Sequence, residues 1–137
     1  MKNQFFKLIT MLYLFILTSC GAALEPPKIN TDYKNIIGKP IKIGNIEAAQ
    51  YDFPKIMNWE DAKKACADLG EGWKLPSNVE LNYLYQNRFA FGVFAPGAYW
   101  SSTEVESGNA IFQSFFVGRQ LDHDKFDPAH IRAIRAF

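Results

Sequence analysis

Apolar residues form one long run near the start of the chain and short periodic groups after it. Residues 8–17 (LITMLYLFIL) are apolar apart from Thr10, and Lys2 and Lys7 supply positive charge before them. This arrangement is typical of a secretory signal peptide. Ten residues rise about 15 Å as a helix, roughly half of a bilayer core. We therefore expect residues 1–19 to be a cleaved signal rather than a membrane span.

The end of this run resembles the bacterial lipobox. Leu17-Thr18-Ser19-Cys20 places an aliphatic residue and two small residues directly before a cysteine. The resemblance implies diacylglyceryl transfer to the Cys20 sulfur, cleavage before Cys20, and attachment of the protein to the membrane through that lipid. Two or three acyl chains anchor a protein far more strongly than a single one. Gly21, where inner-membrane lipoproteins of enteric type carry Asp, favours the outer membrane or cell surface.

The segment 20–37 contains Pro26-Pro27 and polar residues without apolar periodicity, so we expect a tether there. The domain is predicted to occupy residues 38–137. Gly38-Lys39-Pro40 is typical of a turn. Residues 41–43 and 46–48 are expected to be extended on either side of Gly44-Asn45.

Two helices are predicted from caps and periodicity. Asn58 is a good N-cap for a helix over 59–69, and Gly70 is placed to end it. Its apolar positions fall on one face: Trp59, Ala62, Cys66 and Leu69. Ser77 to Glu80 forms a capping box for a helix over 78–86. Its expected buried face comprises Val79, Leu81, Leu84 and Tyr85.

Strands are predicted in the C-terminal half at residues 99–103 and 110–117, with residues 120–121 pairing back. Residues 104–109 are expected to form the first turn. The final segment, 131–137 (IRAIRAF), is ambiguous, because its apolar residues also fit the helical period.

Five short motifs occur in an order that resembles the DUF1566 family, also known as the C-terminal domain of the Legionella collagen-like protein. The motifs are Asn58-Trp59-Glu60-Asp61-Ala62, Gly72-Trp73-Lys74-Leu75-Pro76, Glu80-Leu81, Tyr99-Trp100-Ser101-Ser102-Thr103-Glu104 and residues 131–137. The resemblance covers residues 41–137. It implies an α+β, C-type-lectin-like fold, with two short helices packed on small antiparallel sheets and a terminal strand near the first. It also makes the chain distantly similar to formylglycine-generating, sulfatase-modifying proteins. Family members are often surface adhesins.

The chain departs from the catalytic and calcium-binding relatives of that fold. It lacks the triplets with which calcium-dependent lectins bind metal and sugar, and the paired C-terminal cysteines of formylglycine-generating enzymes. We therefore expect no catalytic residue, metal or cofactor. A weak calcium site at Asp122-His123-Asp124 with Asp127 is the alternative to a solvated hairpin loop.

Charge and cysteine content narrow the function further. The balance of 15 Lys+Arg against 14 Asp+Glu becomes 13 against 14 once Lys2 and Lys7 leave with the signal. A near-neutral domain has no electrostatic reason to bind nucleic acid. A polyanion would need a local basic patch, for which the candidates are Arg88, Arg119, Arg132 and Arg135. With Cys20 lipidated, Cys66 has no disulfide partner, and its apolar helix face predicts a buried thiol rather than a nucleophile.

Aromatic residues crowd between Phe89 and Trp100, where glycine and proline interrupt them. They are expected to fill the core or to form a stacking surface for a ligand. The candidate ligand-binding residues are Phe91, Phe94, Glu104, Arg119, Asp122 and Asp124. The sequence thus predicts a membrane-anchored lipoprotein with a non-catalytic, lectin-like domain that binds a glycan or an envelope or host surface ligand. The alternatives are an assembly subunit of an envelope complex and, less favoured, an enzyme of the sulfatase-modifying type.

Overall fold

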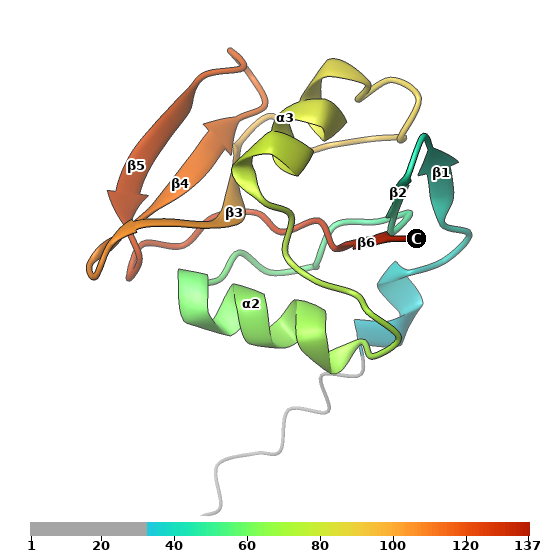
Figure 1. Cartoon of the computed structure of the whole chain (residues 1–137), viewed down its shortest axis with the longest axis horizontal. Helices are drawn as coiled ribbons and strands as arrows, with labels where there is room; N and C mark the ends of the chain where they lie inside the picture. Colours follow the sequence, from blue (N-terminus) through green and yellow to red (C-terminus); the bar gives the residue numbers. More distant parts are fainter. Residues whose placement is uncertain (1–32) are drawn as a thin grey trace, which may run out of the picture. The chain divides into compact units, whose positions relative to one another are not determined.

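The computed structural model describes residues 33–137, which fold as one α+β unit (Figure 1). The signal peptide, Cys20 and most of the expected tether lie outside the described residues. Two short α-helices accompany two three-stranded antiparallel sheets, one ordered β1-β2-β6 and the other β3-β4-β5. The elements are η1 (Tyr33–Ile36), β1 (Ile41–Ile43), β2 (Ile46–Ala48), α2 (Trp59–Asp68), α3 (Asn78–Gln86), β3 (Ala98–Glu106), β4 (Asn109–Ser114), β5 (Gln120–Asp124) and β6 (Ile134–Ala136).

Residues 33–37, which the sequence assigned to the tether, pack against the domain that was expected to begin at residue 38. Residues 33–36 form the 3₁₀ turn η1, and Ile36 is buried in the core. The Tyr33 ring meets Phe53 edge-on at 4.9 Å. The carbonyls of Ile36 and Ile37 accept hydrogen bonds from the backbone of residues 50 and 51. These contacts tie residues 33–37 to the domain, because the side chains bury apolar surface that a free tether would expose.

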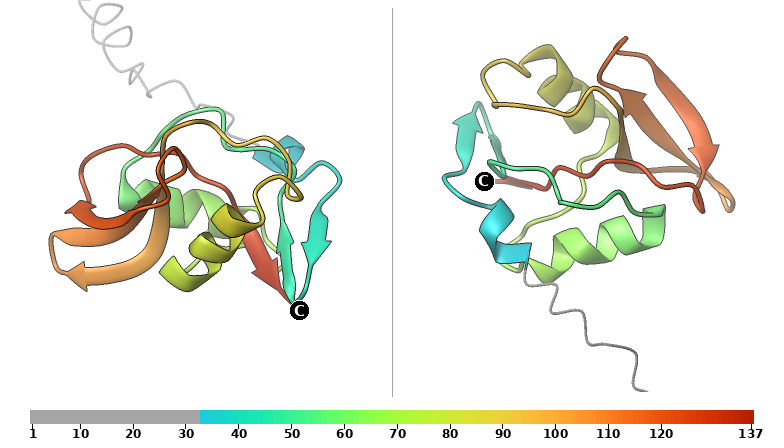
Figure 2. Two further views of the ribbon diagram at one scale, coloured as in Figure 1. Left: turned by 90° about the horizontal axis from the view of Figure 1, so that it is seen from above. Right: turned by 180° about the vertical axis from the view of Figure 1, so that it is seen from behind.

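The first sheet joins the two ends of the described chain. Residues 41–43 and 46–48 are extended as predicted, and they pair as the antiparallel hairpin β1-β2 with Gly44 at φ +61° in its turn. Strand β6 pairs antiparallel with β2, with Ile46 opposite Ala136. The terminal segment is therefore extended, and the helical alternative for residues 131–137 is wrong. In Figure 1 and in the right view of Figure 2, this segment runs across the domain between α2 and α3.

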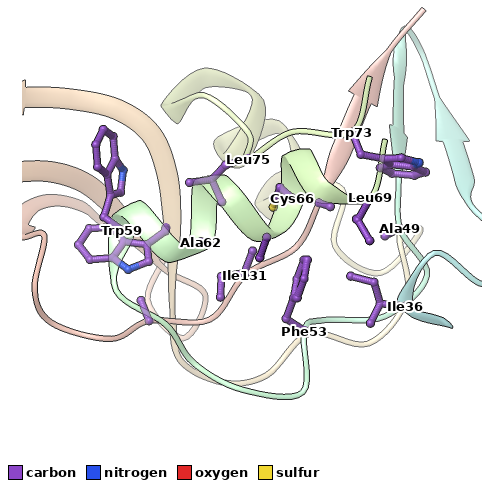
Figure 3. Close-up of a cluster of buried hydrophobic side chains, with 14 of the residues drawn as sticks. Ile36, Ala49, Phe53, Trp59, Ala62, Cys66, Leu69, Trp73, Leu75 and Ile131 are labelled. Atoms are coloured by element: carbon purple, nitrogen blue, oxygen red, sulfur yellow. The ribbon is translucent and has the colours of Figure 1, made fainter. Parts of the chain in front are cut away.

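Helix α2 forms as its cap and periodicity predict. The Asn58 side chain accepts the Asp61 backbone N–H at 2.9 Å, and Gly70 adopts φ +73° after the last turn. The predicted apolar face is buried, with Leu69 as the C-cap. Figure 3 shows the Cys66 side chain among the core side chains beneath this helix. Burial raises the pKa of the Cys66 thiol to about 12.

Helix α3 has the predicted bounds and capping box. The Ser77 hydroxyl accepts the Glu80 N–H, and the Glu80 carboxylate accepts the Ser77 N–H at 2.7 Å. Leu81 and Leu84 are buried, but Val79 is 73% exposed. The prediction for Val79 is wrong because two residues span about 200° of a helix. Val79 therefore points away from the face that Leu81 buries.

The second sheet differs from prediction in its strand lengths. Strand β3 continues to Glu106, and the turn shortens to Ser107-Gly108. Register irregularities between Trp100 and Glu106 let this strand stay paired with β4. Strand β4 ends at Ser114, so residues 115–117 form a turn rather than the end of a strand. This turn brings Phe115 and Phe116 beside the loop that follows α3.

The core consists of two clusters of buried side chains. One lies around α2 and includes Trp59, Trp73 and Trp100 (Figure 3). The other lies around α3 and joins both sheets through Leu81, Phe91, Tyr99, Phe115 and Ile134. Within residues 33–137, no helix is long and apolar enough to cross a membrane.

Candidate functional site: an aromatic cleft beside helix α3

The second core cluster opens to the surface as an apolar cleft of about 360 Å³. The cleft is formed by the loop that follows α3 and the turn that follows β4. Its lining comprises Arg88, Phe89, residues 92–96, Phe115 and Phe116. We refer to these residues as the aromatic cleft.

Three large apolar side chains of the aromatic cleft project into solvent. Phe89 and Val93 are each 88% exposed, and Phe116 is 78% exposed. Single exposed apolar residues are common, but several gathered around one cavity are typical of a binding surface. The three residues leave apolar area in water that a ligand could cover.

The floor of the cleft is a packed aromatic group. Phe94 lies 4.8 Å from Phe115 and 5.6 Å from Tyr99, between ring centroids. Tyr99 and Phe115 are 4.4 Å apart. Such tilted and edge-on contacts add to the stability that burial alone provides. The floor is therefore fixed before any ligand arrives.

A buried arginine holds the rim of the cleft from beneath. Arg132 donates from Nε to Asp52 Oδ1 at 2.6 Å and from Nη2 to the Val93 carbonyl at 2.5 Å. Its Nη1 donates to the Ala49 carbonyl at 3.1 Å. Its guanidinium carbon lies 4.1 Å from the centre of the Phe94 ring. The charge is fully buried yet compensated, as a buried ion requires.

Tyr99 fixes the next part of the same loop. Its hydroxyl donates to Asp52 Oδ2 at 2.6 Å and accepts the Ala95 N–H at 2.6 Å. Burial, followed by the hydrogen bond to Asp52, raises the pKa of Tyr99 well above its usual range. Arg132 and Tyr99 thus hold the loop at the Val93 carbonyl and the Ala95 amide, and Asp52 joins the two.

Two close approaches require glycine beside this site. A Cβ on Gly97 would lie 2.6 Å from the His130 ring, and one on Gly118 would lie 2.6 Å from the Tyr85 ring. Gly118 also has φ +79°. Glycine lets residue 97 lie against His130 and lets residue 118, after the turn, lie against Tyr85 of helix α3.

The rim of the aromatic cleft is positive. The Arg88 guanidinium lies over the rings of Tyr85 and Phe89, 4.4 and 4.7 Å from their centres, and its Nη1 donates to the Tyr85 carbonyl. Among residues 33–137, no carboxylate lies within ion-pair distance of Arg88. The segments 85–99 and 114–121 contain no Asp or Glu. Arg88 is therefore an uncompensated cation at an apolar surface.

The six residues that the sequence nominated as ligand-binding do not form one site in the structure. Phe94 lines the cleft, but Phe91 is 0% exposed and packs in the core, so it cannot meet a ligand directly. Glu104, Arg119, Asp122 and Asp124 are exposed residues that do not line the cleft. Phe89, Val93 and Phe116 are not among these six residues. Their spacing carries no periodic signal, and their exposure depends on the meeting of two segments.

The four arginines proposed as a basic patch do not share a role. Arg132 is fully buried against Asp52. Arg135 pairs with Glu47 and, at 3.3 Å, with Glu71. Arg88, on the rim of the cleft, has no carboxylate partner within residues 33–137. The prediction that Arg132 belongs to a basic surface patch is therefore wrong, because a buried guanidinium cannot contact a polyanion.

The acidic segment 122–127 differs from the expected hairpin loop. Asp122 and Asp124 belong to strand β5, and Asp127 lies in the turn that follows. His123 Nε2 lies 2.9 Å from Asp127 Oδ2. In the part of the chain that the structure describes, no three His, Cys, Asp or Glu residues are grouped so as to hold a metal ion. A second cavity of about 310 Å³ lies nearby, between Asn58, Asp61 and Phe126.

Comparison with known proteins identifies the class of fold. No family model and no curated protein matches the chain. Among solved structures, botrocetin is similar with a TM-score of 0.56 and 9% identity, over 73% of this chain and 98% of botrocetin. The snake venom toxin convulxin gives 0.56 and 10%, over 73% and 96%. EMS16, an antagonist of the collagen receptor integrin α2β1, gives 0.53 and 10%, over 72% and 97%.

The chain therefore folds as a C-type-lectin-like α+β domain, which confirms the predicted fold class. At 9 or 10% identity the likeness establishes the fold alone.

Proposed function

We propose that this protein is a lipid-anchored bacterial envelope lipoprotein whose C-type-lectin-like domain binds a macromolecular ligand in the aromatic cleft without catalysis. The observation that carries the proposal is the exposure of Phe89, Val93 and Phe116 around a floor that is already fixed. Exposed apolar area gathered at one cavity favours association. A fixed floor reduces the ordering cost of binding.

The environment of Cys66 argues against thiol catalysis. A catalytic cysteine needs a lowered pKa and access to substrate. Cys66 is fully buried, and burial raises its pKa to about 12. Very slow labelling of Cys66 by a thiol reagent at pH 8 in the folded protein would agree with this assignment. Rapid labelling would reopen the enzymatic alternative.

The ligand belongs to the envelope or to a host surface in this proposal. The motif resemblance to DUF1566 and the lectin-like fold support a glycan as one class. A protein partner is the other, and it makes the domain an assembly subunit. Botrocetin has been solved in complex with the von Willebrand factor A1 domain, and EMS16 is described as an integrin antagonist. Both descriptions concern protein partners of those neighbours.

The anchor rests on Leu17 to Cys20 and has its own experiment. Cells that produce the wild-type chain should incorporate palmitate into it and retain it in the membrane fraction. Cys20→Ser should lose both. Unchanged membrane retention of that variant would contradict lipid anchoring.

The binding role of the cleft can be tested in intact cells with a photo-crosslinking amino acid. Placed at Val93, it should give a discrete crosslinked product in cells that produce the protein. Placed at Val79, which is also exposed but belongs to α3 outside the cleft, it should not. Equal patterns from both positions would show that the cleft is not the binding surface. Digestion of the product with protease or glycosidase then separates protein from glycan.

A further inference from the structure

We infer that the aromatic cleft binds a protein segment that presents an apolar side chain next to a carboxylate. The inference rests on the proposed function, in which the cleft is the binding site, and it names the chemistry of the ligand. Three properties of the cleft carry it: its size, the apolar nature of every lining side chain except Arg88, and the sign of its charge.

The cleft has room for side chains rather than for a large ligand. Its volume of about 360 Å³ is at the low end of ligand pockets, which span roughly 300–1,000 Å³. Phe94 and Phe115 form its floor, and Phe89, Val93 and Phe116 stand around it. An apolar side chain placed between them would remove both surfaces from water.

Arg88 is the one lining residue with a polar side chain. A sugar would need directed donors and acceptors, but the side chains of Phe, Val, Ala and Pro supply none. The Val93 carbonyl already accepts from Arg132, and the Ala95 amide already donates to Tyr99. The Ala95 carbonyl accepts from Gly97, and Pro96 has no N–H. The network that holds the loop thus occupies some of the backbone groups that a glycan would use, and the lining side chains replace none of them.

Arg88 supplies the polar part of the recognition. Only its Nη1 has an acceptor among the described residues, the Tyr85 carbonyl, so Nη2 and Nε can still donate. A guanidinium binds a carboxylate through two parallel hydrogen bonds, with better geometry than lysine allows. Stacking on Tyr85 and Phe89 holds the group at the edge of the cleft. The absence of Asp and Glu from segments 85–99 and 114–121 leaves this charge unopposed.

The experiment begins with an unbiased probe. A phage-displayed library of random dodecapeptides is selected on the full chain, held in detergent micelles, and counter-selected on Phe116→Asp. The substitution is at an exposed position, so the variant should retain the thermal transition of the wild type. We expect the recovered peptides to combine an aromatic or aliphatic residue with Asp or Glu within two positions of it.

A recovered peptide, made synthetically, then tests the residues one by one. Arg88→Glu should weaken its binding at least tenfold, and Arg88→Lys should weaken it less. Lys55→Glu makes the same change of charge at an exposed residue outside the cleft and serves as the control. Its affinity for the peptide should stay within about twofold of the wild type. Replacing the acid of the peptide by its amide should reproduce the loss seen with Arg88→Glu.

Several results would overturn the inference. These are enrichment of basic peptides, recovery of the same peptides on Phe116→Asp, or equal loss from Arg88→Glu and Lys55→Glu. Glycan-array binding that is lost in Arg88→Glu would assign the cleft to a glycan. Binding of Cys20→Ser to phosphatidylglycerol vesicles that is lost in Phe116→Asp would assign it to lipid. In either case a crosslink from Val93 would still support the cleft as the binding site, so the two proposals fail separately.

Discussion

The aromatic cleft and the acidic hairpin place their charges in opposite ways. We use the name acidic hairpin for residues 104–109 and 122–127. There, Lys125 Nζ donates to Glu104 at 2.5 Å and to the Ser107 carbonyl at 2.9 Å. The Asp124 carboxylate accepts the Phe126 N–H. In the cleft, Arg132 is compensated inside, whereas Arg88 has no carboxylate partner among the described residues.

This difference shows why charge alone is a poor guide to a binding site. The sequence draws attention to the acidic hairpin because its carboxylates are close together. Lys125 and the Phe126 N–H satisfy two of them, Glu104 and Asp124, so less remains for a ligand. The cleft has a modest charge, but that charge lies beside exposed apolar area, where desolvation strengthens an ion pair with a partner.

The largest effect should come from the ion pair beneath the cleft. Arg132→Met removes the donor to Asp52 Oδ1 and to the Val93 carbonyl and leaves the Asp52 charge without its cation. Breaking a buried pair costs about 3–5 kcal/mol in the free energy of unfolding. Urea unfolding followed by tryptophan fluorescence measures it. Arg119→Met, at an exposed residue, should stay within about 0.5 kcal/mol. A loss for Arg132→Met below about 1 kcal/mol would mean that the network does not hold the loop.

Two phenylalanines of the same loop provide a matched pair. Phe91→Ala should cost about 3–5 kcal/mol, because its ring is fully buried. Phe89→Ala should cost no more than about 0.5 kcal/mol, since its ring is already in water. The effect on ligand affinity should be reversed: when only the folded fraction of each variant is counted, Phe89→Ala should weaken binding more than Phe91→Ala. Similar unfolding free energies for the two variants would contradict the assignment of one ring to the core and the other to the rim.

Tyr99→Phe should have an intermediate effect that depends on pH. At pH 7 the lost hydrogen bonds to Asp52 and Ala95 should cost about 1–3 kcal/mol. Because the pKa of Tyr99 is raised in the folded state, its contribution is full below the unfolded value, near 10, and is lost as pH rises above it. The stability difference between wild type and variant should therefore shrink between about pH 9 and 11. A difference that stays constant over this range would be inconsistent with a buried, protonated hydroxyl.

The smallest effect is expected in the acidic hairpin. Hydrogen bonding and charge attraction from Lys125 lower the pKa of Glu104, but this carboxylate is exposed. Glu104→Gln should destabilise the domain slightly at low salt. The effect should disappear at about 1 M salt, where exposed charges are screened. Thermal unfolding at two salt concentrations measures it. A loss as large as that of Arg132→Met would remove the contrast between the two regions.

The parts of the fold that depend on local signals could be predicted from the sequence. Helices α2 and α3 are set by Asn58, Ser77 and Glu80, whose caps act within three residues. The length of β3 could not be predicted, because its pairing with β4 extends it beyond its own apolar pattern. The burial of Arg132 could not be predicted either, since its partner Asp52 is 80 residues away in the sequence.

The candidate site was predicted less well than the fold. Of the two nominated phenylalanines, Phe94 lines the cleft, whereas Phe91, three positions earlier, belongs to the core. Both occur in the same glycine-containing loop, which has no periodicity to distinguish inside from outside. The contribution of Phe116 depends on where β4 ends, and that is decided by the pairing of the sheet.

The hydrogen bond from Arg132 to Val93 also bears on the order of folding. It joins residues 39 positions apart, and the bond from Arg132 to Asp52 spans 80. A chain made from its N-terminus contains Phe89, Val93 and Phe116 before Arg132 exists. Until the last strand joins the sheet, the loop lacks the donor that holds its carbonyl. A chain that ends before residue 132 therefore carries every apolar residue of the cleft but lacks the donor that fixes the Val93 carbonyl.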